Sequence, residues 1–301
     1  MGHSVVMIGA KQYTLEKVVG KGANGVVVEA TCASGTKVAI KLCDPWIARI
    51  HPADRCIDVL RDWGRQTQQV IMDENKHRLK LEFYDVTPDA LVAKLHACDV
   101  HLTPHRKGLS ENFAMWSIAG CVQSVPIGNG ALLMPLLGPS LFGSLPLTPP
   151  LYRKLKEVLI TACMSALVQG VALVDLKPAN ICYAGDTFVV VDTDTLALAA
   201  PGVDTAEPWA TFTVPCLLPS TIATMLVNLV LTLAQAMGTV NAGTVYAKFG
   251  HDSRYGAKID DLAAIAPLTT KPIVDALSPN MSVSMALDTL GQRLPLSPPT
   301  R

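Results

Sequence analysis

The sequence lacks an excess of charge of either sign. It carries 25 Lys and Arg residues against 25 Asp and Glu residues, which gives a net charge of zero over 301 residues. Proteins that bind nucleic acid or anionic membranes through bulk electrostatics carry a basic excess. The composition therefore gives no reason to expect nucleic acid or a charged membrane surface as a partner.

The eight cysteines form no recognisable motif. No CxxC pair occurs, so no cysteine pair stands with histidines in the pattern of a zinc site. Disulfide-rich secreted domains and zinc sites depend on such patterns. We interpret the cysteines as mostly buried thiols of a reducing compartment. No signal-peptide pattern is visible either, so we expect an intracellular protein, in the cytoplasm of its own cell or of a host cell.

One long stretch lacks charge altogether. No charged residue occurs from residue 208 to residue 247, and the apolar run at 217–238 is long enough to cross a bilayer. Polar residues interrupt this run, and Pro219 lies near its start. We therefore predict a buried core helix, apolar on all sides, and no membrane span. The interrupting residues are Thr221, Thr224, Asn228, Thr232 and Gln235.

The N-terminal part contains a glycine motif followed by a strand lysine. VVGKGANGVVVEA places Gly20, Gly22 and Gly25 between two β-branched runs, which predicts two strands joined by a glycine hairpin. Glycines there let backbone N–H groups approach phosphate oxygens. A dinucleotide-binding fold would need a helix after the glycines, whereas strand-like residues continue here. Lys41 then ends the apolar strand VAIK.

The middle of the chain gathers acidic and amide side chains in one short loop. LVDLKPAN contains Asp175, Lys177 and Asn180, and the strand-like run TFVVVD then leads to Asp192. A helical pattern at 151–169 precedes this loop, because its apolar residues recur at intervals of three and four. Carboxylate and amide oxygens are ligands that Mg²⁺ prefers. The loop is therefore a candidate site for a nucleotide phosphate.

Together with ALLMPLLGPSL at 131–141, these segments resemble, in the same order, the motifs of eukaryotic-type protein kinases. The LLGPSL part is similar to casein-kinase-like enzymes. The resemblance implies an α+β, bilobal fold, with a small β-rich N-lobe at about 5–137 and a mostly helical C-lobe at about 138–294. We expect the tail 295–301 to be disordered. The implied activity is that of a divergent ATP-dependent serine/threonine protein kinase that uses Mg²⁺ or Mn²⁺ and acts on a protein substrate.

The resemblance also implies a role for each residue of the loop. Asp175 would orient the substrate hydroxyl and accept its proton, and Lys177, typical of the serine/threonine class, would neutralise the γ-phosphate. Asn180 and Asp192 would hold the metal, and Asp194 either binds a cation as well or caps the next turn. The residues implied for ATP binding are Gly20, Lys21, Gly22, Ala23, Asn24, Gly25, Val26, Val27, Ala39, Lys41, Met134 as gatekeeper, and Pro135, Leu136 and Leu137 as hinge.

The interval between Lys41 and the hinge is about twice the length usual in the family. We therefore predict an N-lobe insertion at about 44–108, which either binds a protein partner, regulates the enzyme or is mere decoration. The insertion leaves open which carboxylate pairs with Lys41. We prefer Glu111, in a helix that Ser110 can cap, over its rivals Glu74 and Asp58.

Several family features are altered. Val174 stands where the family has an arginine that clamps a phosphorylated loop, so we expect activity without control by activation-loop phosphorylation. Thr193 replaces the phenylalanine of the DFG motif, and the APE motif is not recognisable. The apolar helix after Pro219 also lacks the acid that braces the catalytic loop in the family, a role in which Asn228 could serve.

Three functions are compatible with these motifs. The first is an active Ser/Thr protein kinase, the second is a pseudokinase that binds nucleotide or a partner without transfer, and the third is a kinase-fold enzyme acting on a small molecule. We prefer the first, because every residue type that handles phosphate and metal is present and Lys177 argues against the third.

Overall fold

The chain divides into two compact units. The first comprises Met1–Ser117 and Val122–Leu137, and the second comprises Ile118–Cys121 and Gly138–Arg301. The computed structural model describes residues 5–8, 11–22, 25–43, 118–126, 131–193, 196–199, 210–217, 220–250 and 256–291. Outside these residues lie the insertion 44–108, Glu111 and its rivals Glu74 and Asp58, the glycine-loop residues Ala23 and Asn24, Asp194, and the tail 295–301.

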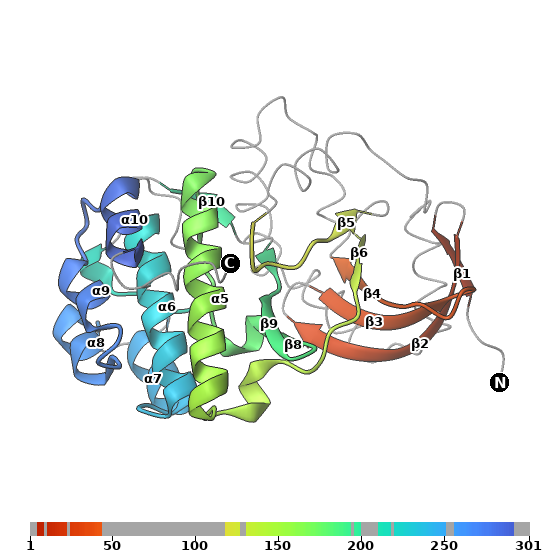
Figure 1. The fold of residues 1–301 in the computed structure, drawn as a ribbon, viewed down its shortest axis with the longest axis horizontal. Coiled ribbons are helices and arrows are strands. Elements are labelled where there is room, and N and C mark those ends of the chain that lie inside the picture. Colours follow the sequence, from red (N-terminus) through yellow and green to blue (C-terminus); the bar gives the residue numbers. More distant parts are fainter. Residues whose placement is uncertain are drawn as a thin grey trace, which may run out of the picture. The chain divides into compact units, whose positions relative to one another are not determined.

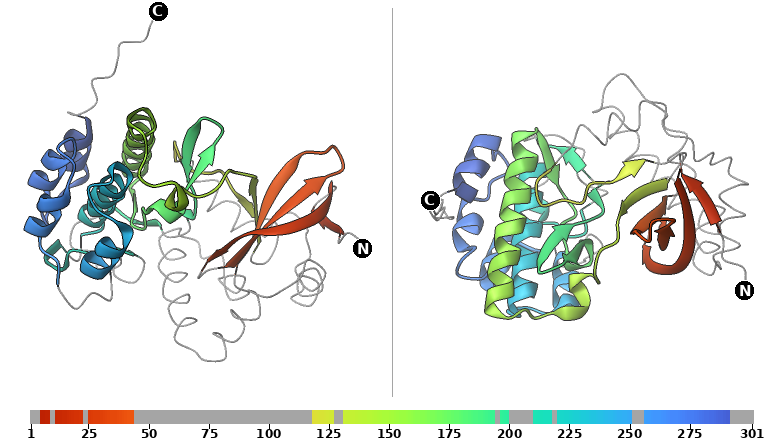
Figure 2. Two further views of the ribbon diagram at one scale, coloured as in Figure 1. Left: turned by 90° about the horizontal axis from the view of Figure 1, so that it is seen from below. Right: turned by 45° about the vertical axis from the view of Figure 1, so that its right-hand side comes forward.

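The first unit contains an antiparallel sheet of six strands in the order β1-β2-β3-β4-β6-β5. The sheet is strongly twisted (Figure 2), as β-branched strands in a small antiparallel sheet tend to be. Its strands are β1 (Val5–Ile8), β2 (Lys11–Gly22), β3 (Gly25–Cys32), β4 (Lys37–Cys43), β5 (Val125–Pro126) and β6 (Ala131–Pro135).

The glycine motif forms the predicted hairpin. β2 and β3 pair antiparallel up to Gly22 and Gly25, which lie opposite each other beside the tip. The register shifts between Val18 and Gly20, so a bulge interrupts the ladder next to the first glycine. The prediction of two strands, with no helix after the glycines, is confirmed.

The second unit is mostly helical and is built around two long helices that lie side by side, α5 and α6 (Figure 1). α5 (Pro149–Val168) starts with two prolines, which suit the first turn because their missing N–H groups would have no intrahelical partner. Its buried residues include Leu155, Leu159, Cys163 and Ala166, spaced by three and four. The helix predicted at 151–169 is therefore confirmed.

Helix α6 (Thr221–Met237) is buried on every side from Thr221 to Ala236. Its N-cap residue is Ser220, whose Oγ accepts a hydrogen bond of 3.2 Å from the Ala223 N–H. Its C-cap residue is Gly238, which adopts the left-handed conformation with φ 81°. The predicted buried core helix is thus confirmed, and none of the helices among the described residues is long and apolar enough to cross a membrane.

Short elements complete the second unit. Two small sheets pair β7 with β10 and β8 with β9. Toward the C-terminus the described residues form the short helices α8, α9 and α10. The bounds are β7 (Val171–Leu173), β8 (Ile181–Ala184), β9 (Thr187–Val190), β10 (Leu196–Leu198), α7 (Ala242–Phe249), α8 (Ile259–Ile265), α9 (Lys271–Ala276), α10 (Val283–Gly291), and the 3₁₀ turns η2 (Leu141–Ser144), η3 (Pro178–Asn180) and η5 (Pro215–Leu217).

The cysteines differ from the expectation. All five whose side chains the structure describes are free thiols, but only Cys163 is buried, whereas Cys32, Cys121 and Cys182 are half-buried and Cys216 is exposed. The prediction of mostly buried thiols is therefore wrong for this set. Sequence alone could not separate these sites, because a cysteine behaves as a small apolar residue in a core and on a surface turn alike.

Candidate active site

The candidate catalytic loop, residues 174–180, runs from the buried strand β7 through η3 to β8. Val174 and Leu176 are almost completely buried, and Val174 has no exposed surface. These two apolar anchors alternate with Asp175 and Lys177, whose side chains are 7% and 20% exposed and face the site. The apolar-polar alternation in LVDLK thus fixes the loop in the core and presents a carboxylate and an ammonium group together.

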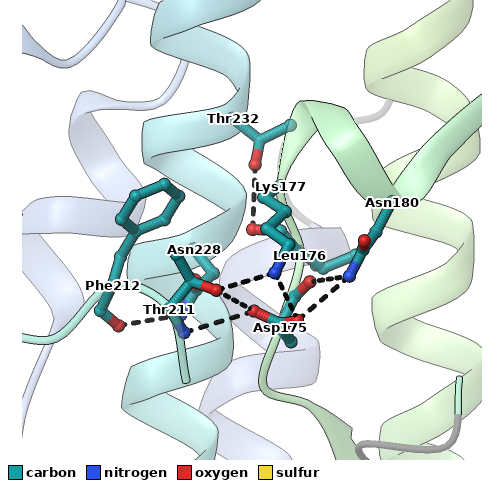
Figure 3. A network of polar contacts seen from close by, with 8 residues as sticks. All are labelled: Asp175, Leu176, Lys177, Asn180, Thr211, Phe212, Asn228 and Thr232. Atoms are coloured by element: carbon teal, nitrogen blue, oxygen red, sulfur yellow. Dashed lines mark hydrogen bonds and ion pairs between the residues drawn. The ribbon is translucent and has the colours of Figure 1, made fainter. Parts of the chain in front are cut away.

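Asp175 is the centre of a hydrogen-bond network (Figure 3). Its Oδ2 accepts bonds from Lys177 Nζ at 2.8 Å and from Asn180 Nδ2 at 3.0 Å. Its Oδ1 accepts bonds from the backbone N–H of Thr211, at 3.2 Å, and from the Thr211 hydroxyl. Four donors from three residues fix the position and rotation of the carboxylate, and the charged partner makes the strongest of these contacts.

Thr211 is a member of this network that the sequence did not point to. Its hydroxyl donates to Asp175 and also accepts a bond from Lys177 Nζ at 2.9 Å. It therefore ties the acid and the lysine together from a segment more than thirty residues further along the chain. The only local signal is a threonine between the buried residues Ala210 and Phe212, and a pattern of that kind does not reveal a long-range contact.

Asn180 is oriented by its amide nitrogen. Nδ2 donates to the Asp175 backbone oxygen at 3.1 Å as well as to the carboxylate, and Figure 3 shows Oδ1 on the side away from Asp175. The Asn180 backbone oxygen accepts a 2.8 Å bond from Val191 N–H. This bond fixes Asn180 beside the residue that precedes Asp192.

Asp192 follows strand β9, as predicted, and has an unusual backbone conformation. Its φ is 61°, a left-handed value that non-glycine residues adopt rarely and often at functional sites. Strand β9 is itself fixed by the β8 hairpin and by a bond of 2.9 Å from Val190 N–H to the Gly120 carbonyl. The side-chain oxygens of Asn180 and Asp192 belong to an amide and a carboxylate, which are kinds of ligand that Mg²⁺ prefers.

Helix α6 donates hydrogen bonds to the backbone next to the network. Thr232 Oγ1 donates to the Leu176 carbonyl at 3.1 Å, and Asn228 Nδ2 donates to the carbonyls of Phe212 and Thr224 at 3.2 and 2.8 Å. The residue that bonds to the catalytic loop is therefore Thr232. The expectation that Asn228 braces this loop is wrong, since its bonds go to the neighbouring segment and to its own helix.

The residues implied for ATP binding in the first unit lie on adjacent strands. Val27 of β3 is paired with Gly20 of β2 on one side and with Lys41 of β4 on the other. Ala39 of β4 is paired with Met134 of β6. Because directly opposed residues point to the same face and residues two apart share a face, Val27, Ala39, Lys41 and Met134 lie on one side of the sheet.

Lys41 is 8% exposed, which is unusual for a lysine and requires compensation of its charge. Met134 is half-buried, and β6 ends one residue later at the exposed Pro135, followed by the half-buried Leu136 and Leu137. Gly20 and Gly22 belong to β2, Gly25 and Val26 to β3, and Lys21 pairs with Val26. Apart from Leu136 and Leu137, which follow β6, the described part of the implied nucleotide set lies on the four neighbouring strands β2, β3, β4 and β6.

Comparisons with known proteins bear on the fold alone. No protein-family model matches the chain, and no curated protein matches it. Many solved structures do match. One of them is a structure of vaccinia related kinase 3, with a TM-score of 0.52 and 10% sequence identity over 97% of this chain and 90% of that chain. The chain therefore has a protein-kinase-like α+β fold, with a β-rich N-terminal part and a helical C-terminal part, as expected.

Proposed function

We propose that this protein is an ATP-dependent Ser/Thr protein kinase that transfers the γ-phosphate of ATP to a protein hydroxyl. The observation that carries the proposal is the network around Asp175. An acid, a lysine and an asparagine from one loop are held in a fixed arrangement by Thr211, beside Asp192 at a strained backbone position. A turn that merely connects β7 to β8 needs none of these contacts.

The geometry supports a separate role for each of these side chains. Asp175 has both oxygens held in place, so it can orient a substrate hydroxyl and take its proton as the oxygen–phosphorus bond forms. Lys177 is one-fifth exposed and is fixed by Asp175 and Thr211. It can offset the negative charge of the γ-phosphoryl group as the bond between that group and the leaving ADP breaks. Asn180 and Asp192 would hold a Mg²⁺ or Mn²⁺ ion, which supplies charge neutralisation of the nucleotide phosphates.

The sheet of the first unit would hold ATP. The glycine hairpin offers backbone N–H groups that phosphate oxygens can approach. Lys41 lies on β4, the strand that pairs with β3 of this hairpin, and adds a buried positive charge. Ala39 and Met134 give the same face of the sheet an apolar part suited to a base. Pro135, Leu136 and Leu137 would then act as the hinge that contacts adenine.

Activity without activation-loop phosphorylation belongs to the proposal. The position before Asp175 is Val174, which is fully buried and apolar, so it cannot bind a phosphate group. The contacts that order the loop come instead from Thr211 and Thr232, which need no modification. We also propose an intracellular location, a role for the insertion 44–108 in binding a protein partner, and pairing of Lys41 with Glu111.

The experiment that tests the proposal is transfer from γ-labelled ATP, with Mg²⁺ or Mn²⁺, to casein and to the protein itself, followed by identification of the labelled amino acid. We expect phosphoserine and phosphothreonine, in amounts that grow with enzyme concentration. Label on tyrosine alone would contradict the Ser/Thr assignment. ATP binding without any transfer would favour a pseudokinase, and transfer to small alcohols but not to proteins would favour the third function.

A further inference from the structure

Two polar side chains of α6 hold the two segments that meet at Asp175. Thr232 Oγ1 donates to the carbonyl of Leu176 at 3.1 Å, and Asn228 Nδ2 donates to the carbonyl of Phe212 at 3.2 Å (Figure 3). Leu176 lies between Asp175 and Lys177, and Phe212 follows Thr211. Each bond from the helix is therefore one residue away from a member of the network.

The two donors lie one helical turn apart on α6 and bond to two different segments. Asn228 and Thr232 are four residues apart on one helix, so their side chains lie on the same face about 6 Å apart along its axis. Both are fully buried, with 0% exposure, as are the side chains of Leu176 and Phe212 at 1% and 0%. The helix thus fixes two backbone positions from inside the core, where an unpaired carbonyl would be costly.

Phe212 is also held from its other side. It forms a β-bridge with Gly250, the Thr213 N–H donates to the Phe249 carbonyl at 2.8 Å, and the Phe212 ring packs edge-on against Tyr246. The segment with Thr211 is therefore locked between α6 and the end of α7. The catalytic loop is hydrogen-bonded to α6 through Thr232, and this bond fixes the loop relative to the segment with Thr211.

We propose that Thr232 and Asn228 are positioning residues that form an uncharged brace, which sets the distance between the catalytic loop and Thr211 so that Thr211 can bind both Asp175 and Lys177. Thr232 controls the loop and Asn228 controls the segment with Thr211. Since neither side chain is charged, the brace needs no buried counter-ion. The kinetic part of its test rests on the proposed phosphate transfer, whereas the structural part does not.

The test compares Thr232→Val, which keeps the shape but loses the hydroxyl, with Thr232→Ser, which keeps the hydroxyl. The matched control is Thr224→Val, since Thr224 is a buried threonine of the same helix (2% exposed) whose contribution to the network is its backbone carbonyl. We expect Thr232→Val to lower kcat about 10-fold with KM for ATP within about 2-fold, because misplacement of the reacting groups affects the chemical step. Thr232→Ser and Thr224→Val should stay within about 3-fold of wild type.

Amide hydrogen exchange gives a readout that needs no activity. The Thr211 N–H is bonded to Asp175, so loss of the brace should speed its exchange about 10-fold in Thr232→Val and in a second variant, Asn228→Leu, but not in Thr232→Ser. Unchanged exchange and kcat in Thr232→Val, or equal losses in Thr224→Val, would overturn the inference. If the wild type transfers no phosphate, the proposed function fails and the exchange result alone decides on the brace.

Discussion

At the scale of single residues, Asp175 and Thr211 depend on each other. The carboxylate receives two bonds from Thr211, one from the backbone N–H and one from the hydroxyl, and Lys177 contacts both residues. Removal of the hydroxyl leaves the lysine and the acid with one contact fewer each. The backbone bond remains, so a change at Thr211 should disturb the site without dismantling it.

We therefore predict that Thr211→Val lowers kcat by about 10- to 100-fold, because small displacements of reacting groups are costly to rate. Thr211→Ser retains the hydroxyl and should stay within about 3-fold of wild type. Steady-state kinetics with ATP and casein measure both, and urea unfolding shows whether each variant is folded. Equal activity of Thr211→Val and wild type would contradict the role assigned to the hydroxyl.

A second prediction at this scale concerns Cys32, at the turn between β3 and β4. Its Sγ lies 2.9 Å from Ser34 Oγ, and this hydrogen bond is the main cause that lowers the pKa of the thiol from 9.0 to about 7. The reactive thiolate is therefore scarce below pH 7 and dominant above it. Burial instead raises the pKa of Cys121 to about 12, so that residue stays a neutral thiol.

Iodoacetamide labelling followed by peptide mass spectrometry should accordingly show Cys32 reacting with a rate that rises to half its maximum near pH 7, while Cys121 stays unlabelled at pH 8. In Ser34→Ala the half-maximum should move toward the ordinary thiol value. A half-maximum near pH 9 for Cys32 in the wild-type protein would show that the hydroxyl contact does not stabilise the thiolate.

At the scale of elements, helix α6 was predictable as a buried helix but not as a brace. The uncharged run 208–247 supports the first conclusion, since a helix that is apolar on all sides in a large domain belongs in its core. The second depends on which carbonyls lie opposite Asn228 and Thr232, and sequence spacing does not contain that information. For the same reason the expectation singled out Asn228 as the partner of the catalytic loop, whereas the structure places Thr232 there.

The N-terminal cap of α6 gives a prediction for stability. Ser220 is fully buried and its Oγ accepts a 3.2 Å bond from the Ala223 N–H. We predict that Ser220→Ala lowers the free energy of unfolding by roughly 0.5–2 kcal/mol, since the capping bond is lost inside the core. Chemical denaturation measures the effect, and Ser144→Ala, at an exposed position of η2, is a matched control that should change little.

At the scale of the whole molecule, most of the fold could be predicted from the motifs and their order along the chain. The glycine hairpin, the strand of Lys41, the helix α5 and the strand before Asp192 are local patterns, and each has its expected form. The network around Asp175 was predictable only in part, because Lys177 and Asn180 are neighbours in sequence but Thr211 is not. The insertion 44–108 and the carboxylate for Lys41 remain predictions, since they fall outside the described residues.

The measurement that tests the central claim most directly is the rate of phosphate transfer from γ-labelled ATP to casein, compared between wild type, Asp175→Ala and Lys41→Met. Asp186→Ala is the control, because Asp186 is an exposed acid of the β8–β9 turn with its side chain 92% exposed. The account predicts transfer by wild type and by the control, with a loss of about 10²- to 10⁴-fold in Asp175→Ala and a similar loss in Lys41→Met. Transfer that survives unchanged in Asp175→Ala, or absence of transfer in wild type that still binds ATP, would contradict it.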